Sequence, residues 1–232
     1  MKLSELLSQL SYGELSNTNF GSSGSGSIKT EKIPAVVNFI NEALLRIYSK
    51  FPLRKKTLYL ELNEWRTDYP LTYDHAYSNP DALDKDKYIF DLGNHKFEDD
   101  VLKIYEVKTT LEVSLPINNP DEDWSVYTPV YNVLQVRRPV GGTVLFVKYW
   151  AKHPKVTEDL NQEIEIPEVL EGALRAYVAF QVYSHMNTQE AVANSQKFQV
   201  LYQEIINEAL TSDSITVSLN QTGLKFKKNG WV

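Results

Sequence analysis

The chain has 232 residues, 42% of them hydrophobic, so it is long enough to bury a substantial core, and disorder of the whole chain is excluded. Its formal net charge of -6 argues against broad electrostatic capture of nucleic acid, because that requires an excess of lysine and arginine. The absence of cysteine rules out disulfides and thiolate metal sites, and it is compatible with folding in the reducing cytoplasm. No apolar run approaches the roughly 18 residues that a membrane helix needs, so we expect a soluble chain without a targeting segment.

The first part of the chain predicts two helices separated by a loop. Leucines at 3, 6, 7 and 10 follow helical spacing and predict a short amphipathic helix that ends before Gly13. Residues 20 to 27, FGSSGSGS, are rich in glycine and serine and predict a flexible loop. A long core helix is expected from Thr30, which we predict as its cap, to Pro52, which stops it. Its apolar stripe comprises Val37, Ile40, Leu44, Ile47 and Phe51.

The middle of the chain predicts β structure. Alternating leucines from Leu58 to Leu62 predict one strand, and residues 63 to 100 resemble a loop excursion with one hairpin. Further strands are expected over 111–117, over 126–136, and over 144–150 after a Gly-Gly turn. About four antiparallel strands are too few and too aromatic to stand as an open sheet. We therefore predict a small β-sandwich or barrel-like insert.

A helical hairpin is predicted from Ile166 to Leu210. Pro167 suits the start of its first helix, with Glu168 and Glu171 in the first turn near the positive end of the helix dipole. Asn187-Thr188 provides the turn and the cap of the second helix. The inward stripe of that helix is predicted to be Ala191, Phe198, Leu201, Ile205 and Ala209.

Together these elements predict an α+β fold, in which an α-helical bundle is formed by both ends of the chain. An antiparallel β-sandwich-like domain is inserted into it, and an extended C-terminal tail follows it. We expect four parts: residues 1–62 as the N-terminal part of the helical domain, 63–163 as the β-rich insert, 164–211 as the helical hairpin, and 212–232 as the tail.

This order of elements resembles a known family. The long helix ends in Phe-Pro, the insert contains DDVLKIYEV and VYTPVYNVLQV, and IPEVLEGALRAYVAFQVYSHM precedes a second amphipathic helix. The most specific block is P-x-x-L-x-x-A-L-x-x-Y-V-A from Pro167 to Ala179, followed by Tyr183 and the Asn187-Thr188 turn. Over roughly residues 28 to 210 the chain resembles the tail adaptor, or head-to-tail connector, proteins of short-tailed bacteriophages.

The resemblance implies a structural protein of the virion neck, made in the host cytoplasm, that is not an enzyme and needs no cofactor. It implies a ring of about twelve subunits beneath the portal protein, with helices side by side around a channel. Genomic DNA would pass through the lumen without sequence-specific binding, and the β insert would reach toward tail nozzle or tail fibre proteins. No membrane is involved. An acidic balance suits such a channel, because carboxylates repel phosphate.

The resemblance also assigns candidate contact residues. The C-terminal tail is expected to dock on the portal through apolar and basic anchors: Leu219, Leu224, Lys225, Phe226, Lys227, Lys228 and Trp231. The polar face of the last helix is expected to contact a neighbouring subunit through Gln189, Gln196, Gln199, Gln203 and Glu204. Aromatic residues of the insert, Trp124, Tyr127 and Tyr131, are expected to face the tail.

Two other functions stay open at the level of sequence. Pro80-Asp81 followed by Glu106 and Lys108 matches the loose PD...ExK pattern of Mg²⁺-dependent nucleases, in which two carboxylates hold the metal. A chain with 30 acidic residues produces such a loose match by chance, and a turn plus a solvated strand face explains these residues better. The alternative is a β-sandwich module that binds carbohydrate or protein on aromatic platforms. Those platforms would be Trp65, Tyr69, Tyr73, Tyr77, Trp124, Tyr127 and Tyr131.

Metal-binding motifs are not supported by the spacing of the ligand-type residues. The four histidines are scattered without the spacing of a zinc site. Asp84 and Asp86 resemble the start of a calcium loop, but Ile89 stands where an EF-hand requires glycine. We therefore expect no resident metal.

Overall fold

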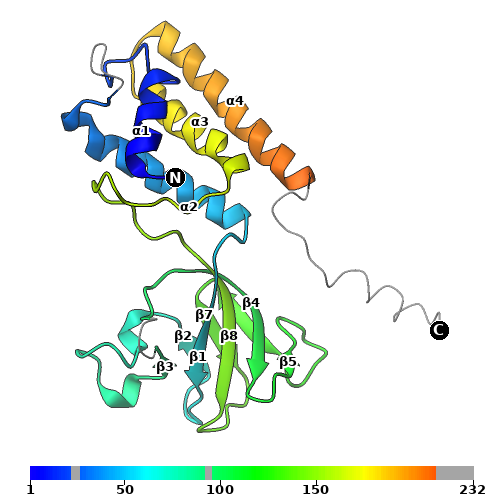
Figure 1. Ribbon diagram of the computed structural model, residues 1–232. Helices are drawn as coiled ribbons and strands as arrows, with labels where there is room; N and C mark the ends of the chain where they lie inside the picture. The colour runs from blue at the N-terminus through cyan, green and yellow to red at the C-terminus, as the bar shows by residue number, and fades with distance from the viewer. Residues whose placement is uncertain (22–26, 92–95, 213–232) are drawn as a thin grey trace, which may run out of the picture. The chain divides into compact units, whose positions relative to one another are not determined.

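The helices lie in one unit of the fold and the strands in another. The computed structural model describes residues 1–21, 27–91 and 96–212 (Figure 1). Among the described residues, the first unit comprises those of Met1–Ile47 and of 155–212, and the second those of Tyr48–Pro154. The chain is thus α+β with antiparallel sheets, as predicted. The four-part domain division stays a prediction.

The N-terminal helices match the sequence patterns closely. Helix α1 spans Leu3–Tyr12 and buries all four of its predicted leucines, and the Gly13 N–H closes it by bonding the Gln9 carbonyl at 2.9 Å. Helix α2 spans Ile33–Lys50, and its predicted apolar stripe is buried. A 3-10 turn, Thr30–Lys32, precedes α2. Thr30 begins that turn, so the prediction that it caps the α-helix is wrong.

The N-terminus of α1 is fastened to a distant loop of the same unit. The Leu3 N–H donates to the Gln162 carbonyl and the Ser4 N–H to the Leu160 carbonyl, both at 3.0 Å. The Ile164 N–H in turn donates to the Met1 carbonyl at 2.8 Å. These bonds satisfy amides that a helix start leaves without an internal partner, and they join both ends of the chain in one unit.

Helices α3, Glu168–Ser184, and α4, Gln189–Thr211, form the predicted hairpin and run side by side in Figure 1. The Thr188 hydroxyl accepts the Ala191 N–H at 3.2 Å, which confirms the predicted cap. The two helices approach closely at Gly172, where an added Cβ would lie 3.3 Å from Ile205 Cδ1. A side chain at position 172 would therefore require the Ile205 side chain to shift by a few tenths of an ångström.

The inward stripe of α4 differs from the prediction. Tyr202 and Ile206 are buried, whereas Leu201 is exposed, so the buried stripe runs through Ala191, Ser195, Tyr202, Ile206 and Ala209. The rings of α3 fix this phase, because Tyr177 lies 5.2 Å from the Tyr202 ring. Hydrophobicity alone favoured Leu201, but adjacent residues lie about 100° apart around a helix, and the contact with Tyr177 places Tyr202 inward and leaves Leu201 exposed.

The second unit contains two antiparallel sheets. The larger has the order β3-β1-β8-β4-β5 and the smaller the order β2-β7-β6. Their bounds are β1 Lys55–Glu61, β2 Asp68–Pro70, β3 Ile89–Phe90, β4 Val101–Thr109, β5 Ser114–Leu115, β6 Val126–Val130, β7 Val133–Val136 and β8 Val144–Ala151. One buried cluster draws on both sheets, including Leu60 and Val147 from the larger sheet and Leu134 from the smaller.

The described residues thus hold eight strands, twice the number predicted, because several are too short to show alternation. The strand predicted over 111–117 reduces to β5, and Leu111 and Val113 are exposed in the turn that precedes it. Glu112 in that turn has φ 59°, a left-handed conformation that ends the extended chain. The strand predicted over 126–136 is the β6–β7 hairpin. The predicted sandwich packing of the sheets stays a prediction.

Both chain connections of the β-rich unit enter the larger sheet at one end. Lys55 pairs with Trp150 near these connections, and Glu61 pairs with Val144 at the other end of the same two strands. We call the latter the far end of the sheet. The loops after β1 and β4 and the turn before β8 all lie there, because β8 runs antiparallel to both neighbours.

Enlarging Gly172 tests the close approach of α3 and α4. We expect Gly172→Leu to lower the free energy of unfolding by about 1–3 kcal/mol, since the new side chain overpacks the contact with Ile205. Urea unfolding followed by circular dichroism measures the change. Ala193→Leu adds the same bulk on the exposed side of α4 and should alter stability by less than about 0.5 kcal/mol. Equal effects from both substitutions would contradict close packing at Gly172.

Candidate functional site

The outward surface of α4 carries a continuous stripe without any charged residue. We call it the uncharged stripe, and it consists of Gln189, Val192, Gln196, Gln199, Val200, Gln203 and Asn207. All seven are exposed, and at 100° per residue they share one side of the helix. Val192 and Val200 are each more than half exposed, which is unusual for valine on a solvated helix. The stripe is therefore suited to contact another protein surface.

The charged residues of α4 occupy the adjacent side. Glu190, Lys197, Glu204 and Glu208 cluster there and are exposed. Of the five residues predicted to contact a neighbouring subunit, the four glutamines lie in the uncharged stripe and Glu204 lies on this charged side. A protein bound to the uncharged stripe would leave these four charged side chains in water. Binding would therefore not have to overcome the cost of desolvating them.

The three aromatic residues predicted to face the tail are not gathered in one place. Trp124 precedes β6 and is 79% exposed, whereas Tyr131 occupies the turn at the opposite end of the β6–β7 hairpin. Tyr127 donates its hydroxyl to the Asn119 carbonyl at 3.1 Å, and its ring lies 4.6 Å from the Arg137 guanidinium. Trp124 lines a cavity.

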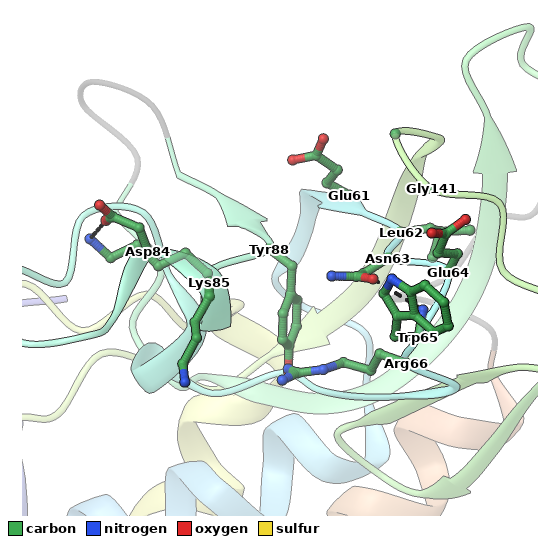
Figure 2. A pocket seen from close by; sticks show the side chains of 12 residues that line it. Glu61, Leu62, Asn63, Glu64, Trp65, Arg66, Asp84, Lys85, Tyr88 and Gly141 are labelled. Atoms are coloured by element: carbon green, nitrogen blue, oxygen red, sulfur yellow. Dashed lines mark hydrogen bonds and ion pairs between the residues drawn. The ribbon is translucent and has the colours of Figure 1, made fainter.

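A polar cavity of about 490 Å³ opens beside the loop after β1 (Figure 2). Figure 2 shows Leu62, Glu64, Trp65 and Gly141 gathered on one side of it. Across it, the Arg66 guanidinium stacks on the Tyr88 ring at 4.8 Å and bonds Asp86 at 3.4 Å.

The charges at this polar cavity are largely balanced. Lys87 pairs with Asp84 at 3.0 Å, which adds a second ion pair to that of Arg66 with Asp86. Burial raises the pKa of Tyr88, so its hydroxyl stays protonated and donates to the Pro70 carbonyl at 2.7 Å. The cavity is thus a polar recess in which two of the lining cations, Arg66 and Lys87, are already paired with carboxylates.

A second cavity, about 290 Å³, lies between Trp124 and the Val140 turn. Its apolar lining includes the buried side chains of Leu62, Val126 and Leu145. Arg137 and Arg138 stand at its rim and are exposed. We call it the Trp124 cavity. Its lining combines an apolar interior with two arginines and one carboxylate, that of Asp123, so the charges of the lining sum to a net positive value.

The residues of the nuclease alternative are engaged in other contacts. The Glu106 carboxylate pairs with Lys148 at 2.7 Å and Lys108 at 3.5 Å, and Ser114 donates to it at 3.2 Å. The hydrogen bond from Lys148 is the main cause that lowers the pKa of Glu106. Asp81 is exposed in a turn stabilised by Asn79. Within 1–21, 27–91 and 96–212, no group of three or more acidic or histidine side chains could hold a metal ion.

The predicted portal-binding residues, Leu219 to Trp231, lie outside the described part of the chain. Sequence reasoning did not find the Trp124 cavity as such, because its lining comes from eight separate stretches between Leu62 and Leu145. A paired Arg137-Arg138 next to Pro139 was the available signal. No helix among the described residues has both the length and the apolar content to span a membrane.

Comparison with known families decides the identity. A family model described as SU10 adaptor protein matches residues 5–222. The chain belongs to the SU10 adaptor protein family. The predicted resemblance to phage tail adaptors is confirmed, and this SU10 adaptor has a structural role in a bacteriophage, at the neck of the virion. No curated protein matches the chain. The family gives no support to the nuclease alternative.

The Glu106–Lys148 pair makes a pH-dependent contribution to stability. Because folding lowers the pKa of Glu106, the pair stabilises the protein above the unfolded-chain value of about 4.3, and this is lost as pH falls through the folded-state pKa. We expect Glu106→Gln to reduce the free energy of unfolding by at most about 1 kcal/mol at neutral pH, because the pair is partly solvated.

The difference between Glu106→Gln and the parent protein should vanish at a pH well below the folded-state pKa, where the carboxyl is protonated in both states. Urea unfolding at a series of pH values measures this. Glu64→Gln is the control, because Glu64 is exposed and forms no ion pair within 4.0 Å among the described residues. A pH-independent difference would show that Glu106 does not stabilise the fold through its charge.

Proposed function

We propose that this SU10 adaptor forms a closed ring of about twelve copies between the portal and the tail, and that the ring continues the DNA channel. Membership of the adaptor family over residues 5–222 is the observation that carries this proposal. The chain then acts by assembly. Its partners are its own copies, the portal, and tail nozzle or tail fibre proteins, while genomic DNA passes through without sequence-specific binding.

The uncharged stripe of α4 is the proposed contact between neighbouring subunits. A closed ring requires each subunit to offer one surface to the next and a different surface to the previous one. The stripe supplies a helix-long surface whose glutamine and asparagine amides form hydrogen bonds and whose valines gain from burial. It contains no ionised group that must be paired or desolvated.

The remaining contacts follow the predicted division of the chain. We propose that the helical parts, 1–62 and 164–211, build the ring wall and that the insert, 63–163, reaches toward the tail. The segment 212–232 docks on the portal, with Leu219, Leu224, Phe226 and Trp231 as apolar anchors and Lys225, Lys227 and Lys228 as basic ones. A net charge of -6 keeps attraction to the passing DNA weak.

The mass of the protein with and without portal tests this function most directly. We expect analytical ultracentrifugation or mass photometry to show a ring-sized particle, either alone or after portal is added. The basic and apolar anchors should be needed for the portal-dependent form, so removal of residues 213–232 should abolish it. A protein that stays monomeric in the presence of its portal would refute the proposal.

A charge placed in the uncharged stripe tests the subunit contact. We expect Val192→Lys to weaken ring formation at least tenfold in apparent assembly constant, because the new ammonium would be buried with no acidic residue one helical turn away. Glu208→Lys introduces the same residue on the charged side of α4 and should leave assembly within about threefold. Circular dichroism checks that both variants are folded. Equal assembly of the two variants would place the subunit contact elsewhere.

A further inference from the structure

The far end of the larger sheet gathers the most exposed apolar side chains of the β-rich unit. Trp65 is 87% exposed in the loop after β1, and Leu111 is 84% exposed in the turn after β4. Val140 stands in the turn before β8, and Trp124 faces the same turn across the Trp124 cavity. Contiguous exposed apolar groups of this kind mark protein contact surfaces.

The Trp124 cavity gives this end a defined recess. Its interior is formed by side chains that are at most 5% exposed, Leu62, Val126 and Leu145, so the fold holds it in place. Trp124 and Val140 form the walls. A volume of about 290 Å³ lies just below the roughly 300 Å³ of the smaller ligand sites in proteins. This suits one bulky apolar side chain with its adjoining backbone.

The rim of the cavity selects the charge of the occupant. Arg137 and Arg138 are exposed, and neither lies within 4.0 Å of a carboxylate in the described part of the chain. Some other cations of this unit are neutralised, for example Arg66 by Asp86 and Lys148 by Glu106. Arg137 is held over the Tyr127 ring, which orients its donors. Guanidinium groups bind carboxylates through paired hydrogen bonds.

The position of the cavity favours a partner other than a copy of this chain. Both connections to the helical unit enter the sheet at the opposite end, beside the Lys55–Trp150 pair. The strands between are seven or eight residues long, and at about 3.3 Å per residue they separate the two ends by roughly 20 Å. The far end is thus free of the chain connections, while the proposed contact between copies lies on α4.

We propose that the Trp124 cavity binds an extended segment of a second virion protein, in which one bulky apolar side chain is flanked by carboxylates. The apolar side chain enters between Trp124 and Val140, and the carboxylates pair with Arg137 and Arg138. This inference rests on the proposed adaptor function for the identity of the partner as a virion protein. The chemistry of the recess itself does not depend on that function.

A synthetic peptide tests the recess directly in the full-length protein. The probe is a capped peptide in which one leucine has two aspartates before it and two after it. It is titrated into the ¹⁵N-labelled protein to millimolar concentration. The four tryptophans give four indole N–H signals, and Trp124→Phe assigns the one that matters. We expect a saturable shift of the Trp124 indole signal. Replacing the leucine of the peptide by serine, or its aspartates by lysines, should weaken the binding affinity at least tenfold.

Matched variants separate the recess from general surface binding. Arg138→Glu should weaken binding at least tenfold, because it places a carboxylate against the carboxylates of the peptide. Tyr131→Ala removes an exposed aromatic ring at the other end of the β6–β7 hairpin and should change nothing. No shift at millimolar peptide, a shift confined to Trp65, or equal binding by Arg138→Glu would each overturn the proposal.

Three further outcomes are distinguishable. A short oligothymidine that shifts Trp124 where the peptide does not would overturn the proposal in favour of a nucleic-acid contact through stacking and arginine. If rings form on the portal but the peptide does not bind, this inference fails and the adaptor function stands. If the peptide binds but no ring forms with portal, the ring function fails, the virion identity of the partner falls with it, and the peptide-binding recess stands.

Discussion

The packing of α4 against α3 is the contact on which the proposed assembly surface depends. Ring contacts between Tyr177 and Tyr202 and between Tyr183 and Phe198, together with the close approach at Gly172, fix the rotation of α4 about its axis. Once Tyr202 and Ile206 face inward, the glutamines and valines of the stripe must face outward. A rotation by one residue would expose Tyr202 and bring charged side chains into the stripe. The rotation of α4 therefore determines both which residues enter the core of the subunit and which residues the proposed contact presents.

The β-rich unit is organised around β8, which lies between β1 and β4 in the larger sheet (Figure 1). Its alternate residues are buried, Leu145, Val147 and Tyr149 among them. The Tyr149 hydroxyl donates to Asp100 at 3.0 Å, and Lys56 also pairs with that carboxylate, which ties β1, β4 and β8 together. Because these central strands hold the sheet together, the loops at the far end are not needed for its core and can form a binding surface.

Regular periodicity made the helices predictable from sequence. The leucines of α1, the stripe of α2 and the Thr188 cap all follow from local rules of spacing and capping. The family resemblance, too, rested on local motifs. The residues of β5, β6 and β7 lie within the predicted strands, but the turns before β5 and between β6 and β7 were missed, because short strands leave little alternation to detect. The phase of α4 was missed because Leu201 and Tyr202 are adjacent and only the partner helix selects between them.

The candidate site was only partly accessible to sequence reasoning. Four glutamines of the uncharged stripe were identified from helical spacing. Val192 and Val200 were not, because the exposure of these valines is known only from the structure. The Trp124 cavity combines residues from Leu62 to Leu145, and their proximity is a property of strand pairing. Trp124 itself was identified, but for a surface shared with Tyr131, from which the β6–β7 hairpin separates it.

The entry of both chain connections at one end of the larger sheet has a consequence for sequence divergence. The loops that close the far end join strands whose pairing is already set by the register of β1, β8 and β4. Insertions or deletions after Glu61, after Thr109 or before Val144 would lengthen or shorten turns without moving a buried side chain to the wrong face. If the far end carries the proposed contact, loop exchange there would change the tail partner without altering the proposed subunit contact on α4.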